Sequence, residues 1–363
     1  MARSSLMLWI VCLTISLVGC RGLTVTTRDY ISIVGPVETT ARITAEQPPV
    51  AEAGRVQAVP VSLGGGVLPC DGPATASGKV ALVELDGLLL NVPFTGPNSL
   101  GENPVAHFRE KLDAIEADPA VRAVVLRVNS PGGGVAAVET MRADLLRFRQ
   151  RTQLPVSAWV GDIGTGGAYY IASAADSIAA SPMSVLGGVG VVLNLFNLYD
   201  LMQQFNIRPQ PIKAGQLVDV GFVGNKLSDA DKALLQAMAD EFHDRLKQQI
   251  VASRPQIDQD NGKTFDGRIF SPNQALSRRL IDRICTLDEA LDAARQAAGC
   301  SNAPVYAYRR RNDPAYSVHA VSANVPSSAL TGVPSVPGLD RSRLPTFLTV
   351  WQPDPTLEKI SGR

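Results

Sequence analysis

Apolar residues along this chain form short runs that alternate with helical stripes. The runs at 79–85, 123–128 and 156–160 have the length and the β-branched content of buried strands. Between them, 105–117 and 135–149 carry apolar residues at intervals of three and four, which predicts amphipathic helices. Strands that alternate with helices in this order predict an α/β fold, with a mostly parallel sheet and flanking helices.

Two of the predicted strands end in glycine-rich segments, 129–134 and 161–167, each of which predicts a tight turn. Glycine leaves no side chain to hold a ligand away from the backbone, and the free amides at the start of each following helix point towards one spot. Such a spot suits a carbonyl oxygen that acquires negative charge. An ordinary pair of strand–helix crossovers, in which glycine only permits close packing, explains the spacing equally well.

A series of motifs follows in a fixed order between Lys79 and Ala298. They are Asn129-Ser130-Pro131-Gly132-Gly133, Gly161-Asp162 with Gly166-Gly167-Ala168-Tyr169-Tyr170-Ile171-Ala172, Ala174-Ala175-Asp176-Ser177-Ile178-Ala179, Leu186-Gly187-Gly188-Val189-Gly190-Val191, Ile212-Lys213-Ala214-Gly215, and Asp266-Gly267-Arg268-Ile269-Phe270 with Ala275 and Leu280-Ile281-Asp282. This series resembles the signal peptide peptidase A (SppA) family of serine peptidases. The resemblance implies a ClpP/crotonase-like, mostly parallel sheet of repeated ββα and βα units with flanking helices. The chain shows no internal repeat, which matches the single-repeat form of that family.

The chain departs from the family at both catalytic positions. The family's nucleophilic serine stands three residues before the tyrosine pair, where this chain has Gly166. The family's general-base lysine lies in a Gly-x-x-Lys-Asp-x-Gly segment, and its position here is Val218. Glycine has no side-chain atom that could attack, and valine cannot accept a proton. A buried lysine without its serine would be an uncompensated charge, so an apolar residue there is the expected companion change.

The resemblance therefore implies a catalytically degenerate peptidase, which binds extended peptides, signal-peptide remnants or partners without cutting them. We expect the amides of Gly132 and Gly133 to converge near Gly167 as the oxyanion and peptide-binding site. The space between Gly166 and Val218 is expected to be apolar.

Two alternatives stay open. Thr165 directly precedes Gly166 and could act as a fallback nucleophile in an active endopeptidase, but it needs a base; Lys213 and Lys226 follow it in the sequence. The other alternative is a crotonase-like acyl-transfer enzyme, because that related fold also uses two backbone amides as an oxyanion hole. It predicts a cytoplasmic protein that handles nucleotides.

The N-terminus has the layout of a secretory signal peptide, with Arg3 followed by an apolar run at 6–18. Leu17-Val18-Gly19-Cys20 resembles a bacterial lipobox, which predicts export and lipid anchoring at Cys20. A transmembrane anchor is the alternative, but the run is shorter than the roughly 20 residues a spanning helix needs. Arg21 is not the aspartate associated with inner-membrane retention. We therefore expect a lipoprotein on the periplasmic face of a membrane, the outer membrane in a diderm host.

Composition changes along the chain predict four regions. They are a signal peptide at 1–19, a tether at 20–77 with possible strands at 23–27 and 30–34, a peptidase-like domain at 78–300, and a Pro/Ser-rich extension at 301–363 with possible edge strands at 306–308 and 347–351. The extension contains the basic cluster 309–311, which predicts either a solvated patch or a contact with anionic lipid.

Composition and charge exclude several classes of partner. A formal net charge of +0 gives no electrostatic footprint for nucleic acid. The three histidines, His107, His243 and His319, are not spaced as metal ligands and are expected to be partly exposed, so neither a metal nor another cofactor is implied. Cys285 and Cys300 flank a predicted helix about 20 Å long, too far apart for a disulfide.

A long helix predicted after Ser228 bears on assembly. Ser228 begins it with a capping box, and one stripe of the helix carries Leu235, Met238, Phe242, Leu246 and Ile250. Such a stripe belongs either to the core or to a subunit interface. With the family resemblance, it favours a homo-oligomer.

Overall fold

The computed structural model describes residues 25–30, 36–41, 56–61, 78–92, 103–195, 197–299, 301–310 and 347–351. The chain forms two compact units, Met1–Glu52 and Ala53–Arg363. The described part of the first unit is a hairpin of two antiparallel strands, β1 (Val25–Tyr30) and β2 (Pro36–Ala41). Both strands begin later in the chain than the predicted strands at 23–27 and 30–34. Tyr30 ends the first strand, whereas it was expected to begin the second.

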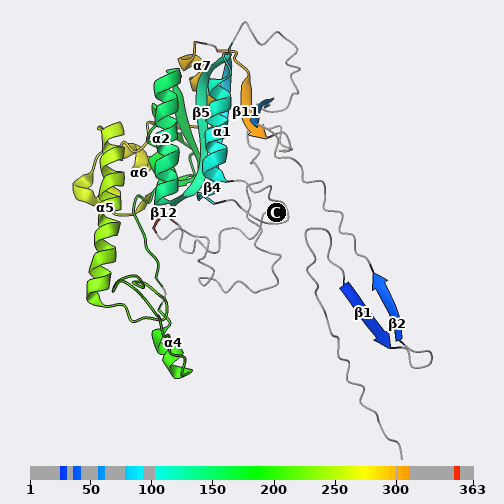
Figure 1. Ribbon diagram of the computed structural model, residues 1–363. Coiled ribbons are helices and arrows are strands. Elements are labelled where there is room, and N and C mark those ends of the chain that lie inside the picture. The colour runs from blue at the N-terminus through cyan, green and yellow to red at the C-terminus, as the bar shows by residue number, and fades with distance from the viewer. Residues whose placement is uncertain are drawn as a thin grey trace, which may run out of the picture. The chain divides into compact units, whose positions relative to one another are not determined.

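The second unit is built on a sheet in which ten strands are described (Figure 1). The strands are β3 (Val56–Pro60), β4 (Lys79–Leu89), β5 (Val121–Gly134), β6 (Val156–Thr165), β7 (Ser177–Ala180), β8 (Val185–Gly187), β9 (Ile269–Phe270), β10 (Arg283–Ile284), β11 (Val305–Arg310) and β12 (Leu348–Val350). Their order is β10-β7-β6-β5-β4-β11-β3, with β12 paired to β5, and with β8 paired to both β6 and β9. Every pair from β10 to β11 is parallel, whereas β3, β9 and β12 pair antiparallel. The predicted α/β fold with a mostly parallel, ClpP-like sheet is confirmed.

Side-chain alternation along the central strands divides the core between the two faces of the sheet. In β4, Ala81 and Val83 face one layer, and Val80 and Leu82 face the other. The helices are α1 (Pro104–Glu116), α2 (Val135–Thr152), α3 (Gly167–Ala172), α4 (Tyr199–Gln204), α5 (Asp229–Ser253), α6 (Pro272–Ser277) and α7 (Leu287–Ala297), with a 3₁₀ helix at Asp260–Phe265. The first three helices pack on the face of Ala81, and α7 packs on the face of Val80. Because helices cover both faces, the central strands are apolar on both.

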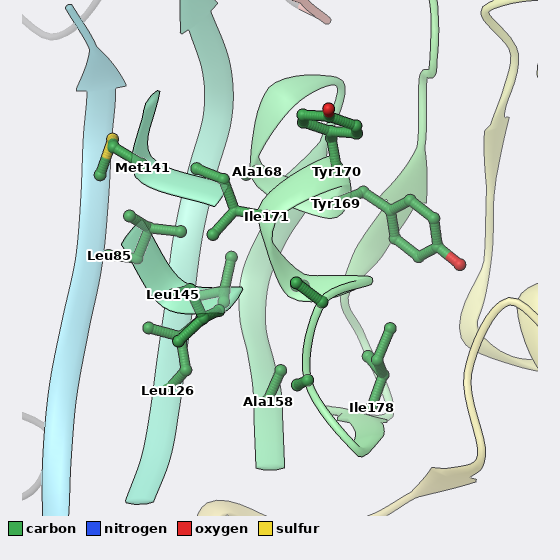
Figure 2. Close-up of a cluster of buried hydrophobic side chains, with 14 of the residues drawn as sticks. Leu85, Leu126, Met141, Leu145, Ala158, Ala168, Tyr169, Tyr170, Ile171 and Ile178 are labelled. Carbon is green, nitrogen blue, oxygen red and sulfur yellow. The ribbon is translucent and has the colours of Figure 1, made fainter. Parts of the chain in front are cut away.

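Figure 2 shows the larger layer around α3. Leu85, Leu126 and Ala158 come from three neighbouring strands and share one cluster with Ala168 and Ile171 of α3. The helix that follows the second glycine-rich segment is therefore entirely buried, and its position is fixed by the core.

The ends of the sheet correct three expectations. The segment expected to be a tether contributes β3, and the extension contributes β11, which lies between β4 and β3 and not at an edge. Arg309 is fully buried and forms an ion pair with Glu84, while Arg310 pairs with Glu110. The basic cluster is therefore neither a solvated patch nor a lipid contact over its described residues, because two of its arginines are used inside the fold.

Two side chains that the sequence did not assign to the core, His107 and Cys285, are buried. His107 lies inside α1, and burial, with the nearby charges of Lys111 and Arg310, lowers the pKa of its imidazole to about 3. It was expected to be partly exposed, but its face of the helix packs on the sheet. Cys285 is free and buried, and burial raises the pKa of its thiol. Cys20, Cys70, Cys300 and His319 lie outside the described residues.

Candidate active site

The first glycine-rich segment is the last part of a strand, whereas the sequence predicted a turn. β5 continues to Gly134, with a register shift between Val128 and Ser130. The Ser130 hydroxyl donates to the carbonyl of Gly87 over 2.6 Å and accepts from the amide of Gly132 over 3.1 Å. A Cβ on Gly133 would overlap the backbone of the neighbouring strand β4 at Leu89. Glycine therefore serves close pairing of two strands here.

The second glycine-rich segment is a sharp turn from strand to helix. β6 continues to Thr165, α3 begins at Gly167, and Gly166 stands between them with φ 53° and ψ −122°. L residues with a side chain rarely adopt this conformation. Nucleophile elbows of α/β-hydrolases place their attacking residue on a similarly sharp turn from strand to helix. Gly166, which the motifs in the sequence place at the position of the family serine, lies on this turn and has no side chain that could attack.

The two segments meet, and a third strand meets them at the same place. The Gly167 amide nitrogen lies 2.8 Å from the point that a Cβ on Gly132 would occupy. The carbonyl oxygen of Thr349, in β12, lies so close to that point that a Cβ would overlap it. A Cβ on Gly166 would lie 2.6 Å from the Thr349 carbonyl oxygen, 2.9 Å from its carbon and 3.1 Å from the Val350 nitrogen. The Thr349–Val350 peptide group thus lies directly against Gly166, beside Gly132 and Gly167.

The third strand is held along both edges. On one side β12 pairs antiparallel with β5, so that Thr349 lies opposite Gly133. On the other side, Leu348 exchanges two backbone hydrogen bonds with Val192, of 2.8 and 3.1 Å. We call the space between Gly132–Gly134 and Val192 the glycine slot, and we call Phe347–Trp351 the tail segment. In this structure the tail segment occupies the glycine slot.

Thr165, the candidate fallback nucleophile, is fully buried, and its hydroxyl donates to the carbonyl of Pro131 over 3.2 Å. Among the residues described, no lysine amine hydrogen bonds to that hydroxyl. Lys213 instead donates to Asp219 over 2.6 Å and to the Gln216 carbonyl over 3.2 Å. The Thr165 hydroxyl therefore has a backbone carbonyl as its hydrogen-bond acceptor, and no described lysine is in position to take its proton.

Val218, which the motifs in the sequence place at the position of the family lysine, has a side chain that is 69% exposed. It belongs to residues 198–228, which include α4 and precede α5 and which we call the arm (α4 and α5 are labelled in Figure 1). It therefore does not line an enclosed apolar space with Gly166, contrary to expectation. Lys226 is also exposed on this arm.

A buried charge cluster lies beside the slot, where β4 and β5 run together. Glu84 accepts from Arg127 over 3.1 Å and from Arg309, and all three side chains are buried. Asp86 lies opposite Asn129 in the register. Burial raises the pKa of the Asp86 carboxyl to about 6, the neighbouring Glu84 charge adds to the rise, and Arg127 opposes it. The cluster joins β4, β5 and β11, at the part of β5 that precedes the slot glycines.

No motif in the sequence marks the tail segment as part of this site. Its residues alternate enough to predict an edge strand, but nothing in a single strand's pattern names its partner. Within the described residues no group of three or more His, Cys, Asp or Glu side chains could hold a metal ion. None of the described helices is long and apolar enough to cross a bilayer.

Comparison with known proteins agrees with the fold and the motifs. Residues 148–301 match the model of Peptidase family S49. A protease homologue of Methanocaldococcus jannaschii is 32% identical over 197 residues, which are 54% of this chain and 63% of the relative. The SppA homologue of Enterococcus faecium is 26% identical over 232 residues, 64% of this chain and 67% of the relative. The chain therefore spans about two thirds of the length of these relatives.

Among solved structures, the chain is similar to the 1510-N membrane-bound stomatin-specific protease in complex with a substrate peptide. That structure has 14% sequence identity and a TM-score of 0.34, and the match covers 59% of this chain and 79% of the other.

Proposed function

Because this chain belongs to the SppA family of serine peptidases, peptidase family S49, we propose that it is a family member that binds extended peptides without hydrolysing them. One observation carries the proposal. The Gly166 turn faces the carbonyl carbon of a peptide group in the slot, 2.9 Å from where a Cβ would stand, and offers no side-chain atom to attack it. Peptide binding needs the backbone edges of the slot, and hydrolysis needs in addition a nucleophile and a base.

The second candidate, an active peptidase that uses Thr165, has less support. Its hydroxyl is fully buried and donates to the Pro131 carbonyl. An attacking hydroxyl must instead give its proton to a base as it bonds to the carbonyl carbon. No observation on this chain favours the crotonase-like acyl-transfer alternative over peptide binding.

Hydrolysis by the purified full chain tests the proposal. Unstructured peptides are incubated with the wild type, Thr165→Ala and Thr165→Ser, and products are identified by mass spectrometry. We expect none of the three to yield products above a no-protein blank. Cleavage by the wild type and Thr165→Ser that disappears in Thr165→Ala would establish Thr165 as a nucleophile and overturn the proposal. Cleavage that persists in all three would point to a contaminating enzyme, which repurification of the sample would remove.

Assembly into a homo-oligomer is part of the same proposal. The arm carries large apolar side chains that are 48% to 104% exposed: Leu201, Phe205, Ile207, Ile212, Leu217, Val218 and Phe222. Exposed apolar surface of this kind marks protein–protein contacts. Phe205→Asp and Ile212→Asp should lower the molar mass measured by light scattering, whereas Met183→Asp, an exposed apolar residue away from the arm, should leave it unchanged.

Export and lipid anchoring at Cys20 complete the proposal. Cys20 follows an apolar run and a small residue, as in a lipobox. An N-terminal acyl anchor would hold the slot at a membrane surface, where peptides released during export arise. Mass spectrometry of the protein purified from membranes should find an acylated N-terminal peptide that begins at Cys20. A chain that begins at Met1 and carries no lipid would overturn this part.

A further inference from the structure

We infer that the glycine slot is a self-occupied peptide site. Its resident ligand is the chain's own tail segment, and its ligand class is an extended peptide with the pattern apolar, small β-branched, apolar. The inference rests on the proposed peptide-binding function and adds both the regulation and the specificity of that site. It is carried by the backbone pairing, the side-chain packing and the glycines around β12.

Backbone pairing fixes the ligand as an extended strand. The amide of Val135 donates to the Phe347 carbonyl over 3.3 Å, and the amide of Trp351 donates to the Pro131 carbonyl over 3.0 Å. Between these two bonds, β12 pairs with β5 on one edge and with Val192 on the other. A strand held on both edges is bound mainly through its main chain, so other extended peptides can take its place.

Side-chain packing defines the pattern. Leu348 is 3% exposed and clusters with Leu88 and Leu90, and Val350 packs against the same cluster. Thr349 is fully buried on the opposite face, where its Cγ2 atom would lie 3.0 Å from a Cβ on Gly167. A larger side chain at the position of Thr349 would meet that backbone. The slot therefore accepts apolar residues on the first face and only a small residue on the second.

The glycine at 166 and the occupied slot depend on each other. A side chain at 166 would begin 2.6 Å from the Thr349 carbonyl oxygen, well inside the ordinary contact distance. A Cβ on Gly188 would likewise lie 2.8 Å from the Cβ of Trp351. The residue that removes the nucleophile is thus also the residue that makes room for the bound strand. An external peptide must displace the tail segment, which belongs to the same chain and therefore competes at an effective concentration on the order of millimolar.

The test uses the full chain and a fluorescent synthetic peptide with the sequence of residues 345–353. Leu348→Asp places a charge in the apolar cluster and should release the tail segment. We expect this variant to bind the peptide at least tenfold more tightly than the wild type, because the competing segment has left. Thr349→Pro, which cannot pair with Gly133, is a second way to release the segment. Met183→Asp, a control at a residue 89% exposed, should bind as the wild type does.

The outcomes separate the inference from the function on which it rests. Circular dichroism and the thermal midpoint establish that each variant is folded. A peptide of the same composition in scrambled order should bind at least tenfold more weakly to Leu348→Asp than the 345–353 peptide does. Equal affinity of the wild type and both folded variants for the 345–353 peptide overturns self-occupancy and leaves peptide binding standing. Binding by none of them overturns both self-occupancy and the proposed peptide binding. Cleavage of the bound peptide by Leu348→Asp overturns the proposed function and leaves self-occupancy standing.

Discussion

Replacing Gly166 with alanine tests how closely the tail segment lies against the site. Two costs are expected. A residue with a side chain held in a sparsely populated region, such as φ 53° and ψ −122°, costs about 1–3 kcal/mol. In addition, the new Cβ would lie 2.6 Å from the Thr349 carbonyl oxygen and 3.1 Å from the Val350 nitrogen, so the segment must move away.

The second cost can be isolated with a matched variant. Gly299 has φ 67°, close to the 53° of Gly166, and a Cβ there would meet no atom within 4 Å. Gly299→Ala therefore reports the cost of a side chain at positive φ without a steric contact. Departure of the tail segment exposes Leu348, and burying a leucine contributes about 1.5–3 kcal/mol. We expect Gly166→Ala to lower the free energy of unfolding by about 2 kcal/mol more than Gly299→Ala does.

Urea unfolding of both variants measures this difference, and hydrogen exchange shows where it arises. In Gly166→Ala the amides of Gly133 and Trp351 should lose protection, while those of β6 and β7 keep it. Equal destabilisation by the two alanines, with the tail amides still protected, would refute the contact between Gly166 and the tail segment.

Three further predictions follow from buried polar groups. The Thr349 hydroxyl has no hydrogen-bond partner among the described residues. A 345–353 peptide with valine at this position should therefore bind Leu348→Asp about fivefold more tightly, a gain of ~1 kcal/mol, and serine should bring no gain; equal anisotropy titrations for threonine and valine would contradict this. Glu84→Gln leaves two buried arginines poorly compensated and should cost about 3–5 kcal/mol in urea unfolding, whereas Glu110→Gln, at the surface, should cost less than about 1 kcal/mol. Because the pKa of Asp86 is raised to about 6 in the folded chain, the folded chain keeps a proton there that the unfolded chain loses at about pH 4. The stability of the folded chain is therefore highest, as far as Asp86 is concerned, below about pH 4, and this contribution is lost as the pH rises through about 6. Asp86→Asn should thus gain about 3 kcal/mol over the wild type between pH 4 and pH 8, and a constant difference would contradict that reasoning.

The alternation of strands and helices was predictable because it depends on local periodicity. The α1 stripe of Phe108, Leu112 and Ile115 is buried as expected, and the Ser228 capping box is present. The long α5 stripe proves to be core only at Leu246 and Ile250. Its beginning, near Met238, stays exposed in the single chain.

What the sequence could not show were contacts between distant segments. The glycines at 132–134 predicted a turn, because glycine most often punctuates turns. They are instead extended, because β4 and β12 approach from both sides too closely for side chains. The position of Arg309 was mispredicted for a similar reason. A run of arginines is usually solvated, and nothing in the run indicates that Arg309 pairs with Glu84, which is distant in the sequence.

The approach of the two glycine-rich segments to each other was predictable, and the strand that lies against them was not. Gly132 and Gly167 lie together, as the order of the motifs suggested. Val218, which the motifs in the sequence place at the position of the family lysine, is 69% exposed on the arm instead. Sequence motifs thus locate backbone features that the fold itself builds, but they do not say which peptide fills them.

Incubation of the purified full chain with the 345–353 peptide, followed by mass spectrometry, tests the central claim most directly. The bond between Thr349 and Val350 is the one held against Gly166, so it is the bond at which a working site would cut. We predict that Leu348→Asp, whose slot is open, binds this peptide and returns it intact. Products that end at Thr349 and begin at Val350, formed by Leu348→Asp and absent from Leu348→Asp with Thr165→Ala, would contradict the account.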